Sequence, residues 1–229
     1  MSRRLSEKKV QDRALAYLHR HYRFRARRGR VFVQAEVRTR PRYGGKRADG
    51  LLAYRSWWGP TRVVSLEAKS LKTLRALRPR RQDHWLLMRS LWMGLLVCLG
   101  SGAFFFLYKM DDPYLRYALP LNVLIGTALL YALLTRRSSR HQQAQVIDQL
   151  QQYPANRQWL ACSADSLRDL TERERQQLKA ICRRRGIGVL VVPQRGRVRR
   201  WLRPGFHRKW IGDFLEYYSR ENEIRRILA

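Results

Sequence analysis

Acidic residues are scarce in this chain of 229 residues. Aspartate and glutamate together number 17, against 48 lysines and arginines, which leaves a formal net charge of +31. Such an excess is more than solubility requires, and it repels itself unless a polyanion screens it. Nucleic acid and the anionic surface of a membrane are the partners that this charge favours.

Cysteines are also few, and histidines do not cluster. The three cysteines lie far apart without a CxxC pair, which excludes a disulfide scaffold and gives no support to a structural zinc site. Disorder is disfavoured as well, because hydrophobic residues make up 45% of the chain and aromatic residues 11%. The composition therefore predicts a folded protein that depends on its own hydrophobic core.

Two long runs without any charge interrupt this polar sequence. Residues 90–108 and 117–135 each have nineteen residues, and a helix of that length spans about 28 Å, close to the hydrocarbon core of a bilayer. Arginines flank the pair, whereas the connector carries Asp111 and Asp112. The positive-inside rule then predicts a multi-pass protein of the inner (cytoplasmic) membrane with both termini in the cytoplasm. The alternative is a buried helical hairpin in a soluble core.

The rest of the chain predicts one α/β domain in two pieces. Residues 1–80 form the first half, 81–140 the membrane hairpin and 141–229 the second half with a basic C-terminal region. The element order predicts a mixed sheet flanked by helices. We expect helices at 6–21, 141–153, 171–185 and 209–228, and strands near 30–39, 47–54, 61–69, 157–163 and 187–193, with a further strand pairing with the last.

Three polar residues stand out on the predicted hairpin of 47–54 and 61–69. If the hairpin is centred near Trp58, Asp49 and Glu67 lie directly opposite each other, with Cβ atoms about 4.5–5.5 Å apart. Lys69 follows Glu67 by two residues and projects from the same face. Facing carboxylates can share a divalent cation, and the lysine can neutralise charge on a phosphate. The alternative is an ordinary solvated strand end.

These residues resemble a known family. RADGLLAY (47–54) followed by VVSLEAKS (63–70) is similar to the PD-(D/E)xK motif of restriction-endonuclease-like nucleases, with Ala48 at the proline position. The resemblance implies a restriction-endonuclease-like fold that hydrolyses DNA phosphodiester bonds with Mg²⁺ or Mn²⁺. It implies metal binding by Asp49 and Glu67, with Lys69 at the nucleophile. A further acidic ligand in this family comes from the first helix, which implies Asp12, with Glu7 as the fallback and Glu36 as a weaker candidate.

RecB-like branches of the family also carry a QhxxY helix, which Gln149 and Tyr153 match. The resemblance places both side chains on one face of the predicted helix 141–153, near the DNA. The two membrane spans between Lys69 and this helix depart from the family pattern. The alternative for Gln149 and Tyr153 is a plain amphipathic helix face.

Arginines interleaved with aromatic residues form two further segments, 20–30 and 183–209. A planar guanidinium binds two phosphate oxygens at once, so these segments predict contacts to nucleic acid. Bias from a GC-rich genome would explain arginine over lysine but not the excess of bases over acids. The DNA-binding candidates in the second segment are Arg195, Arg197, Arg199 and Arg200.

Taken together, these features predict a membrane-anchored, Mg²⁺-dependent DNA nuclease, whose tether would suit defence, DNA uptake or repair. Two alternatives stay open. One is a catalytically inactive nuclease fold that binds DNA or a partner at the membrane, and the other is a membrane scaffold that binds anionic lipid.

Overall fold

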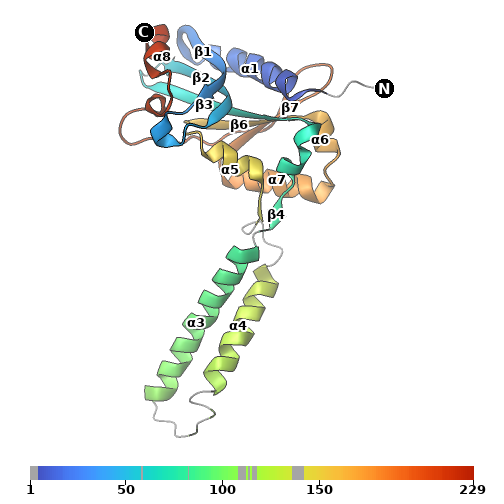
Figure 1. Cartoon of the computed structure of the whole chain (residues 1–229), viewed down its shortest axis with the longest axis vertical. Coiled ribbons are helices and arrows are strands. Elements are labelled where there is room, and N and C mark those ends of the chain that lie inside the picture. The colour runs from blue at the N-terminus through green and yellow to red at the C-terminus, as the bar shows by residue number, and fades with distance from the viewer. Residues whose placement is uncertain are drawn as a thin grey trace. The chain divides into compact units, whose positions relative to one another are not determined.

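The computed structural model describes residues 5–57, 59–81, 83–107, 112, 114, 118–135 and 142–229. The chain divides into two compact units (Figure 1). One consists of Met1–Pro79 together with Ala144–Ala229 and carries a six-stranded sheet. The other is Arg80–Gln143 and carries two long helices.

The six-stranded sheet is mixed, which confirms the predicted α/β class with helices on both faces. Its strand order is β1-β2-β3-β6-β7-β8. The first three strands are antiparallel, β3, β6 and β7 are parallel, and β8 returns antiparallel at the edge. The strands are β1 (Ala26–Arg38), β2 (Arg47–Ser56), β3 (Thr61–Lys69), β6 (Arg157–Ser163), β7 (Ile187–Val192) and β8 (Arg199–Leu202).

Helix α1 (Glu7–Arg23) covers one face of the sheet. It begins at Ser6, whose side chain accepts a hydrogen bond from the Lys9 N–H, as an N-cap does. Val10, Ala14 and Leu18 recur every four residues and are fully buried against the sheet. The contact is close at Gly50, where an added Cβ would lie 2.7 Å from Cδ2 of Leu15, a residue of α1.

The other face is covered by two groups of helices (Figure 1). Helices α2 (Leu74–Leu77), α5 (Gln145–Gln151) and α7 (Glu172–Arg184) share a core with β6 and β7, beside the short α6 (Ala164–Arg168). The 3₁₀ helix η5 (Phe214–Tyr217) and α8 (Glu221–Leu228) share a second core with β1, β2 and β3. Short 3₁₀ turns at Pro41–Tyr43 and Leu71–Thr73 complete this unit.

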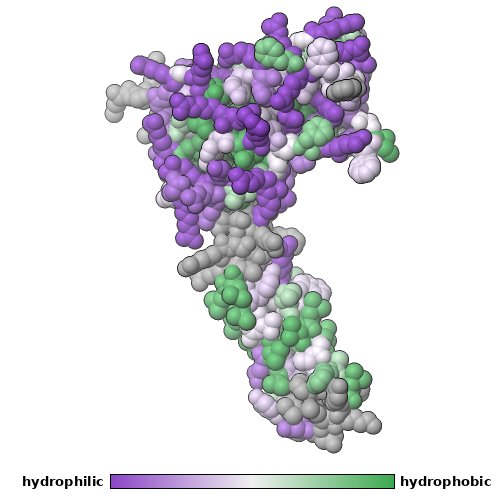
Figure 2. All heavy atoms as spheres, turned by 180° about the vertical axis from the view of Figure 1, so that it is seen from behind, coloured by the Kyte–Doolittle hydropathy of each residue, from purple (hydrophilic) through white to green (hydrophobic). Residues whose placement is uncertain are grey.

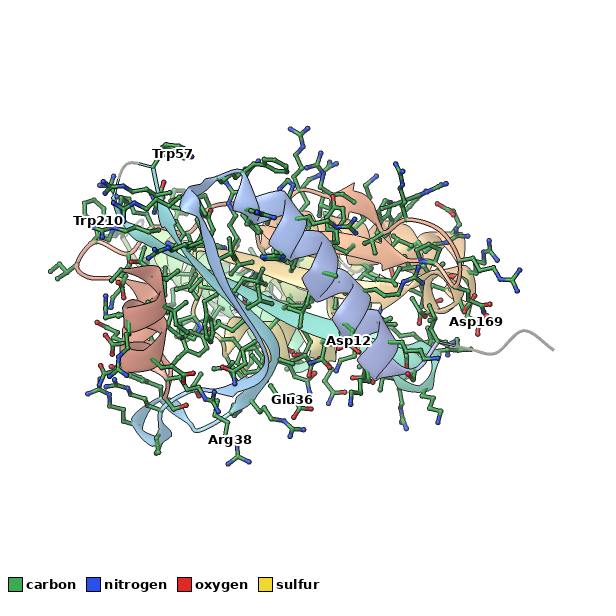
Figure 3. All side chains as sticks on the ribbon, turned by 90° about the horizontal axis from the view of Figure 1, so that it is seen from above. Asp12, Glu36, Arg38, Trp57, Asp169 and Trp210 are labelled. Atoms are coloured by element: carbon green, nitrogen blue, oxygen red, sulfur yellow. The ribbon has the colours of Figure 1, made fainter. Side chains whose placement is uncertain are left out.

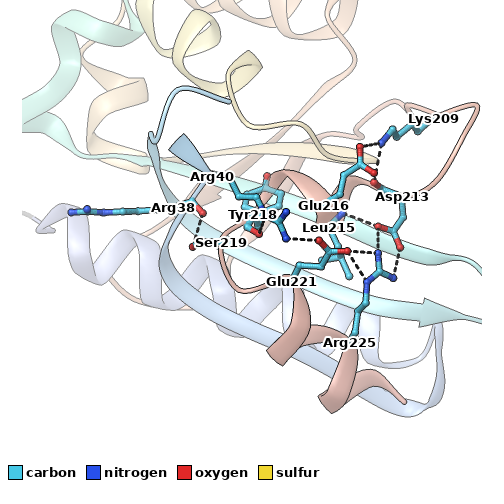
Figure 4. A network of polar contacts seen from close by, with 10 residues as sticks. All are labelled: Arg38, Arg40, Lys209, Asp213, Leu215, Glu216, Tyr218, Ser219, Glu221 and Arg225. Atoms are coloured by element: carbon cyan, nitrogen blue, oxygen red, sulfur yellow. Dashed lines mark hydrogen bonds and ion pairs between the residues drawn. The ribbon is translucent and has the colours of Figure 1, made fainter. Parts of the chain in front are cut away.

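The C-terminal segment is fastened by ion pairs (Figure 4). Arg225 contacts Asp213 at 2.9 Å and Glu221 at 2.7 Å, and Glu221 also contacts Arg40 at 2.7 Å, just after β1. Asp213 caps η5 by accepting from the Leu215 N–H. Several of the chain's few acids are thus used to fix the C-terminal segment beside β1.

Three sequence-predicted elements differ from the structure. The helix expected at 141–153 is α5, which ends at Gln151 because Pro154 disfavours helical backbone at Tyr153. The helix expected at 209–228 is broken, since Gly212 has a φ of 74 and only η5 and α8 follow it. The first strand begins at Ala26, four residues earlier than expected, with an irregular register before Val31.

The second unit contains helices α3 (Asp83–Leu107) and α4 (Leu119–Thr135), together with a two-stranded ladder of β4 (Arg80–Arg81) and β5 (Gln142–Gln143). The helices pack closely at Gly94, where a Cβ would lie 2.7 Å from the Leu124 carbonyl oxygen. Hydrophobic side chains gather on both helices (Figure 2). Within the described residues, one helical segment, Leu87–Phe104 of α3, is long and apolar enough to cross a membrane, and 11% of it is buried. The apolar stretch of α4, Leu119–Leu134, is shorter.

Asn156 connects β3 to the loop that follows β8. Its Oδ1 accepts from the Val63 N–H at 2.8 Å and its Nδ2 donates to the His207 carbonyl at 3.0 Å, with the residue 5% exposed. We expect Asn156→Ala to lower the free energy of unfolding by about 1–3 kcal/mol, because it leaves buried backbone groups unpaired. Urea denaturation of the full chain measures this. The exposed Asn222→Ala is the matched control and should change it by less than about 0.5 kcal/mol; equal effects would contradict the prediction.

Candidate carboxylate–lysine site

The register of β2 and β3 brings Asp49 and Glu67 together. The paired positions run from Arg55 with Thr61 to Gly50 with Leu66, so the next step along the ladder sets Asp49 opposite Glu67. Asp49 Oδ2 accepts a hydrogen bond from the Ala68 N–H at 2.8 Å, which holds this carboxylate beside Glu67. The register is therefore the one that a hairpin centred near Trp58 requires.

Asp49, Glu67 and Lys69 project from the sheet face opposite α1. Side chains alternate along a strand, and Val64, Leu66 and Ala68 of β3 pack with α1, so Glu67 and Lys69 face the other way. Glu67 is 4% exposed and Lys69 7%, although both are charged residue types. The group is thus a buried polar cluster at the end of two strands, on the face that carries α5.

Lys69 connects the cluster to α1. Its Nζ lies 2.8 Å from Glu67 Oε1 and 3.5 Å from Glu7 Oε1. Glu7 Oε2 also accepts from the Thr73 hydroxyl at 3.3 Å, and the Gln11 side chain donates to the Asp49 carbonyl. Sequence reasoning missed Gln11 and Thr73. The signal for Gln11 was its place one helical turn after Glu7, on the buried side of α1.

The electrostatics of the cluster raise the pKa values of both acids and of the lysine. Burial and the neighbouring Asp49 raise the pKa of Glu67 to about 7. Burial raises the pKa of Asp49 as well, against the opposing effect of the Ala68 N–H. Burial disfavours the Lys69 ammonium, but its contact with Glu67 and the nearby acids outweigh this and raise the pKa of Lys69. Glu67 is buried and Asp49 half-buried, and their carboxylates repel each other when both are charged, with Lys69 as the neighbouring cation.

The structure brings Glu7, the fallback candidate, to the cluster and leaves Asp12 outside it. Asp12 is exposed on α1, because it lies off the stripe that faces the sheet (Figure 3). The expectation for Asp12 is wrong for this reason. Glu36 lies opposite Asp49 by register but has a φ of 56 and pairs with Arg47 at 3.4 Å, both side chains being 56% exposed. The Glu36 side chain therefore forms an ion pair on the surface and is not part of the cluster.

Gln149 and Tyr153 do not share one helix face, since Tyr153 follows the end of α5. Tyr153 is 6% exposed, and its hydroxyl donates to the Arg47 carbonyl at 2.8 Å, two residues before Asp49. Burial and the charges of Glu67 and Asp49 raise the pKa of Tyr153 to about 12. Gln149 Oε1 is buried and has no hydrogen-bond partner among the described residues. Tyr153 therefore positions the start of β2 and is too buried for a surface contact to DNA.

The four predicted DNA-binding arginines lie away from this cluster. All of them are exposed, Arg195 and Arg197 in the turn after β7 and Arg199 and Arg200 on the edge strand β8. β8 is three strands from β3 in the sheet order. The cluster and the basic edge are therefore separate parts of one unit.

The donor set fits a Mg²⁺ or Mn²⁺ ion that has few protein ligands. Among the described residues, no group of three or more His, Cys, Asp or Glu side chains is arranged to hold a metal. Mg²⁺ is usually held by one or two carboxylates, with waters and substrate phosphates completing its shell. Asp49 and Glu67 supply such a pair, and Glu67 Oε2 is a buried oxygen to which no described residue donates a hydrogen bond.

No protein-family model, curated protein or solved structure matches this chain. The assignment of a function consequently depends on the geometry and electrostatics of the cluster itself.

The raised pKa of Glu67 predicts a pH-dependent stability. The folded chain retains the Glu67 proton up to a pH of about 7, whereas the unfolded chain loses it near 4.5. The free energy of unfolding should therefore fall as pH rises through this window, with a contribution of at most about 1.4 kcal/mol per pH unit. Urea denaturation at a series of pH values should show a shallower fall for Glu67→Gln. The exposed Glu36→Gln should behave as wild type; identical slopes for Glu67→Gln and wild type would contradict the assignment.

Proposed function

We propose that this protein is a metal-dependent nuclease that hydrolyses DNA phosphodiester bonds at the Asp49–Glu67–Lys69 cluster. The observation that carries the proposal is a pair of opposed carboxylates, Glu67 buried and Asp49 half-buried, with a lysine ammonium 2.8 Å from Glu67. This arrangement, at the end of two antiparallel strands, is also what the resemblance to PD-(D/E)xK nucleases implies.

Asp49 and Glu67 would hold the Mg²⁺ or Mn²⁺ ion. The chemistry that a bound ion supplies is polarisation of a phosphoryl oxygen and a lower pKa for an attacking water. Glu67 and Glu7 hold the Lys69 ammonium in place from two sides. From there, Lys69 can neutralise the charge that develops on the phosphate, a contribution that preorganised donors make without moving.

We propose further that α3 and α4 form a two-span hairpin in the cytoplasmic membrane, with both termini in the cytoplasm. Leu87–Phe104 is apolar and mostly exposed, whereas a core helix of a soluble protein would be buried. Arginines precede α3 and follow α4, while Asp112 lies between the helices. A tethered domain would cut DNA only close to the membrane.

Lys69→Ala should abolish DNA cleavage, with a loss of about 10²–10³-fold or more, because it removes the charge opposite the phosphate. Cleavage of labelled DNA by the full chain in detergent, with Mg²⁺ or Mn²⁺ and with EDTA, measures this. The exposed Lys72→Ala is the matched control and should cut as wild type. If wild type and Lys69→Ala both bind DNA and wild type cuts no form of it, the site is a binding module and the proposal fails.

The membrane topology predicts opposite reporter signals at two positions. Alkaline phosphatase inserted after Asp112 should be active, because it would lie outside the cytoplasm, whereas the same enzyme fused after Ala229 should be inactive. Green fluorescent protein at the two positions should give the reverse pattern. Phosphatase inactive at both positions, with a chain that alkaline carbonate washes off the membrane, would contradict the two-span hairpin.

A further inference from the structure

A concave surface lies at the end of the sheet-bearing unit opposite the Asp49–Glu67–Lys69 cluster. A cavity of about 440 Å³ opens at the turn between β2 and β3. Its lining comes from the end of α1, the hairpin turn, the start of β6 and the loop after β8. We call this the hairpin-end surface, defined by Phe24, Arg25, Trp57, Arg62, Arg157 and Phe206.

The rings of the hairpin-end surface are exposed. Phe24 is 86% exposed, Trp57 67% and Phe206 46%. Large aromatic side chains normally gain most of their stabilisation from burial, so three exposed rings around one cavity indicate a binding surface. Figure 3 shows Trp57 at the end of the unit away from Asp12.

The described residues supply no carboxylate within ion-pair distance of Arg25, Arg62 or Arg157. Two of these guanidiniums stack on Phe206, with Cζ of Arg62 4.5 Å and Cζ of Arg157 5.9 Å from its centroid. Stacking leaves the edges of a guanidinium free to donate to phosphate oxygens.

Hydrogen bonds hold the backbone of the residues on both sides of Phe206. Two hydrogen bonds join Asn156 and His207. The His207 N–H donates to the Asn156 carbonyl, and the Asn156 side chain donates to the His207 carbonyl. The Gly205 N–H donates to the Gly186 carbonyl at 2.8 Å. These hydrogen bonds hold the backbone on both sides of Phe206, which lowers the entropy that this loop loses on binding.

The surface continues in both directions through shared residues. Phe24 also lines a cavity of about 390 Å³ with Arg20 and Arg197, one of the sequence-predicted arginines. Arg62 and Phe206 also line a cavity of about 440 Å³ with Arg208. Arginines and exposed rings thus alternate along a track longer than one cavity.

We propose that the hairpin-end surface binds single-stranded nucleic acid, with unpaired bases stacked on Phe24 and Trp57 and phosphates bound by Arg25 and by Arg62 and Arg157, which lie over the Phe206 ring. Exposed ring faces fit unpaired bases, because the bases of a duplex are already stacked on each other. The concave lining argues against a flat lipid surface. The inference deepens the proposed function by naming its substrate class, and it rests on that function only for the cleavage that follows binding.

The binding surface and the cluster are separate. Arg62 and Glu67 lie five residues apart on β3, which is about 17 Å along an extended strand. Substitutions at the hairpin-end surface therefore leave Asp49, Glu67 and Lys69 untouched, and binding can be measured without cleavage.

The test is fluorescence anisotropy of the full chain in detergent with EDTA, using a labelled oligothymidine and a blunt duplex of equal length. Wild type should bind the single strand more tightly. Phe24→Ala and Trp57→Ala should each weaken it at least about fivefold, the lower end of measured base-stacking effects. Trp210→Ala is the matched control, since Trp210 is 97% exposed but lines none of these three cavities, and it should bind as wild type.

Three results would overturn the inference: equal binding of single strand and duplex, equal effects of Trp57→Ala and Trp210→Ala, or binding of phosphatidylglycerol vesicles without binding of the oligonucleotide. Lys69→Ala should keep full single-strand binding. A wild-type chain that binds the single strand selectively but cuts nothing would support the inference while the proposed nuclease function fails.

Discussion

The register between β2 and β3 is the constraint on which the candidate site depends. Side chains alternate across a strand, so a slip of one residue would turn Asp49 towards α1 and break the pair with Glu67. The register is fixed by hydrophobic packing, because Leu52 and Leu66 bury against α1 on one face while Leu51 and Val63 bury on the other. Gly50 adds a steric requirement, since only glycine lets Leu15 approach β2 at that point. The packing of the core therefore sets the geometry of the acids.

That geometry has an electrostatic cost within the domain. Burial raises the pKa of both Asp49 and Glu67, and each carboxylate repels the other. The Ala68 N–H and the Lys69 ammonium offset part of this cost. If such a pair served only stability, apolar residues could take its place, because that replacement is often neutral or favourable for the stability of the fold. An unfavourable pair kept in an otherwise well-packed core is the kind of arrangement that a bound cation relieves.

The sequence allowed the strands and their pairing to be predicted more reliably than the side chains that reach the cluster from helices. Alternating hydrophobic residues and the spacing of Asp49 and Glu67 were enough for the hairpin register. The choice between Asp12 and Glu7 required knowing which side of α1 faces the sheet. The buried stripe of Val10, Ala14 and Leu18 marks that side. The break before Tyr153 was readable from Pro154, and Gly212, with a φ of 74°, lies at the break before η5. The meeting of Arg25, Arg62 and Arg157 around one cavity is a property of the fold alone.

The cluster uses Lys69 as its cation, although most basic residues of the chain are arginines. A guanidinium at position 69 would bind a carboxylate through both oxygens and neutralise it permanently. The Lys69 ammonium is a compact charge that contacts Glu67 Oε1, and Glu67 Oε2 has no hydrogen-bond partner among the described residues. The nearest arginine in β2, Arg47, is instead paired with Glu36 on the surface. Lysine at this position thus keeps one buried carboxylate oxygen available for a ligand, while the arginines remain at surfaces where phosphate can reach them.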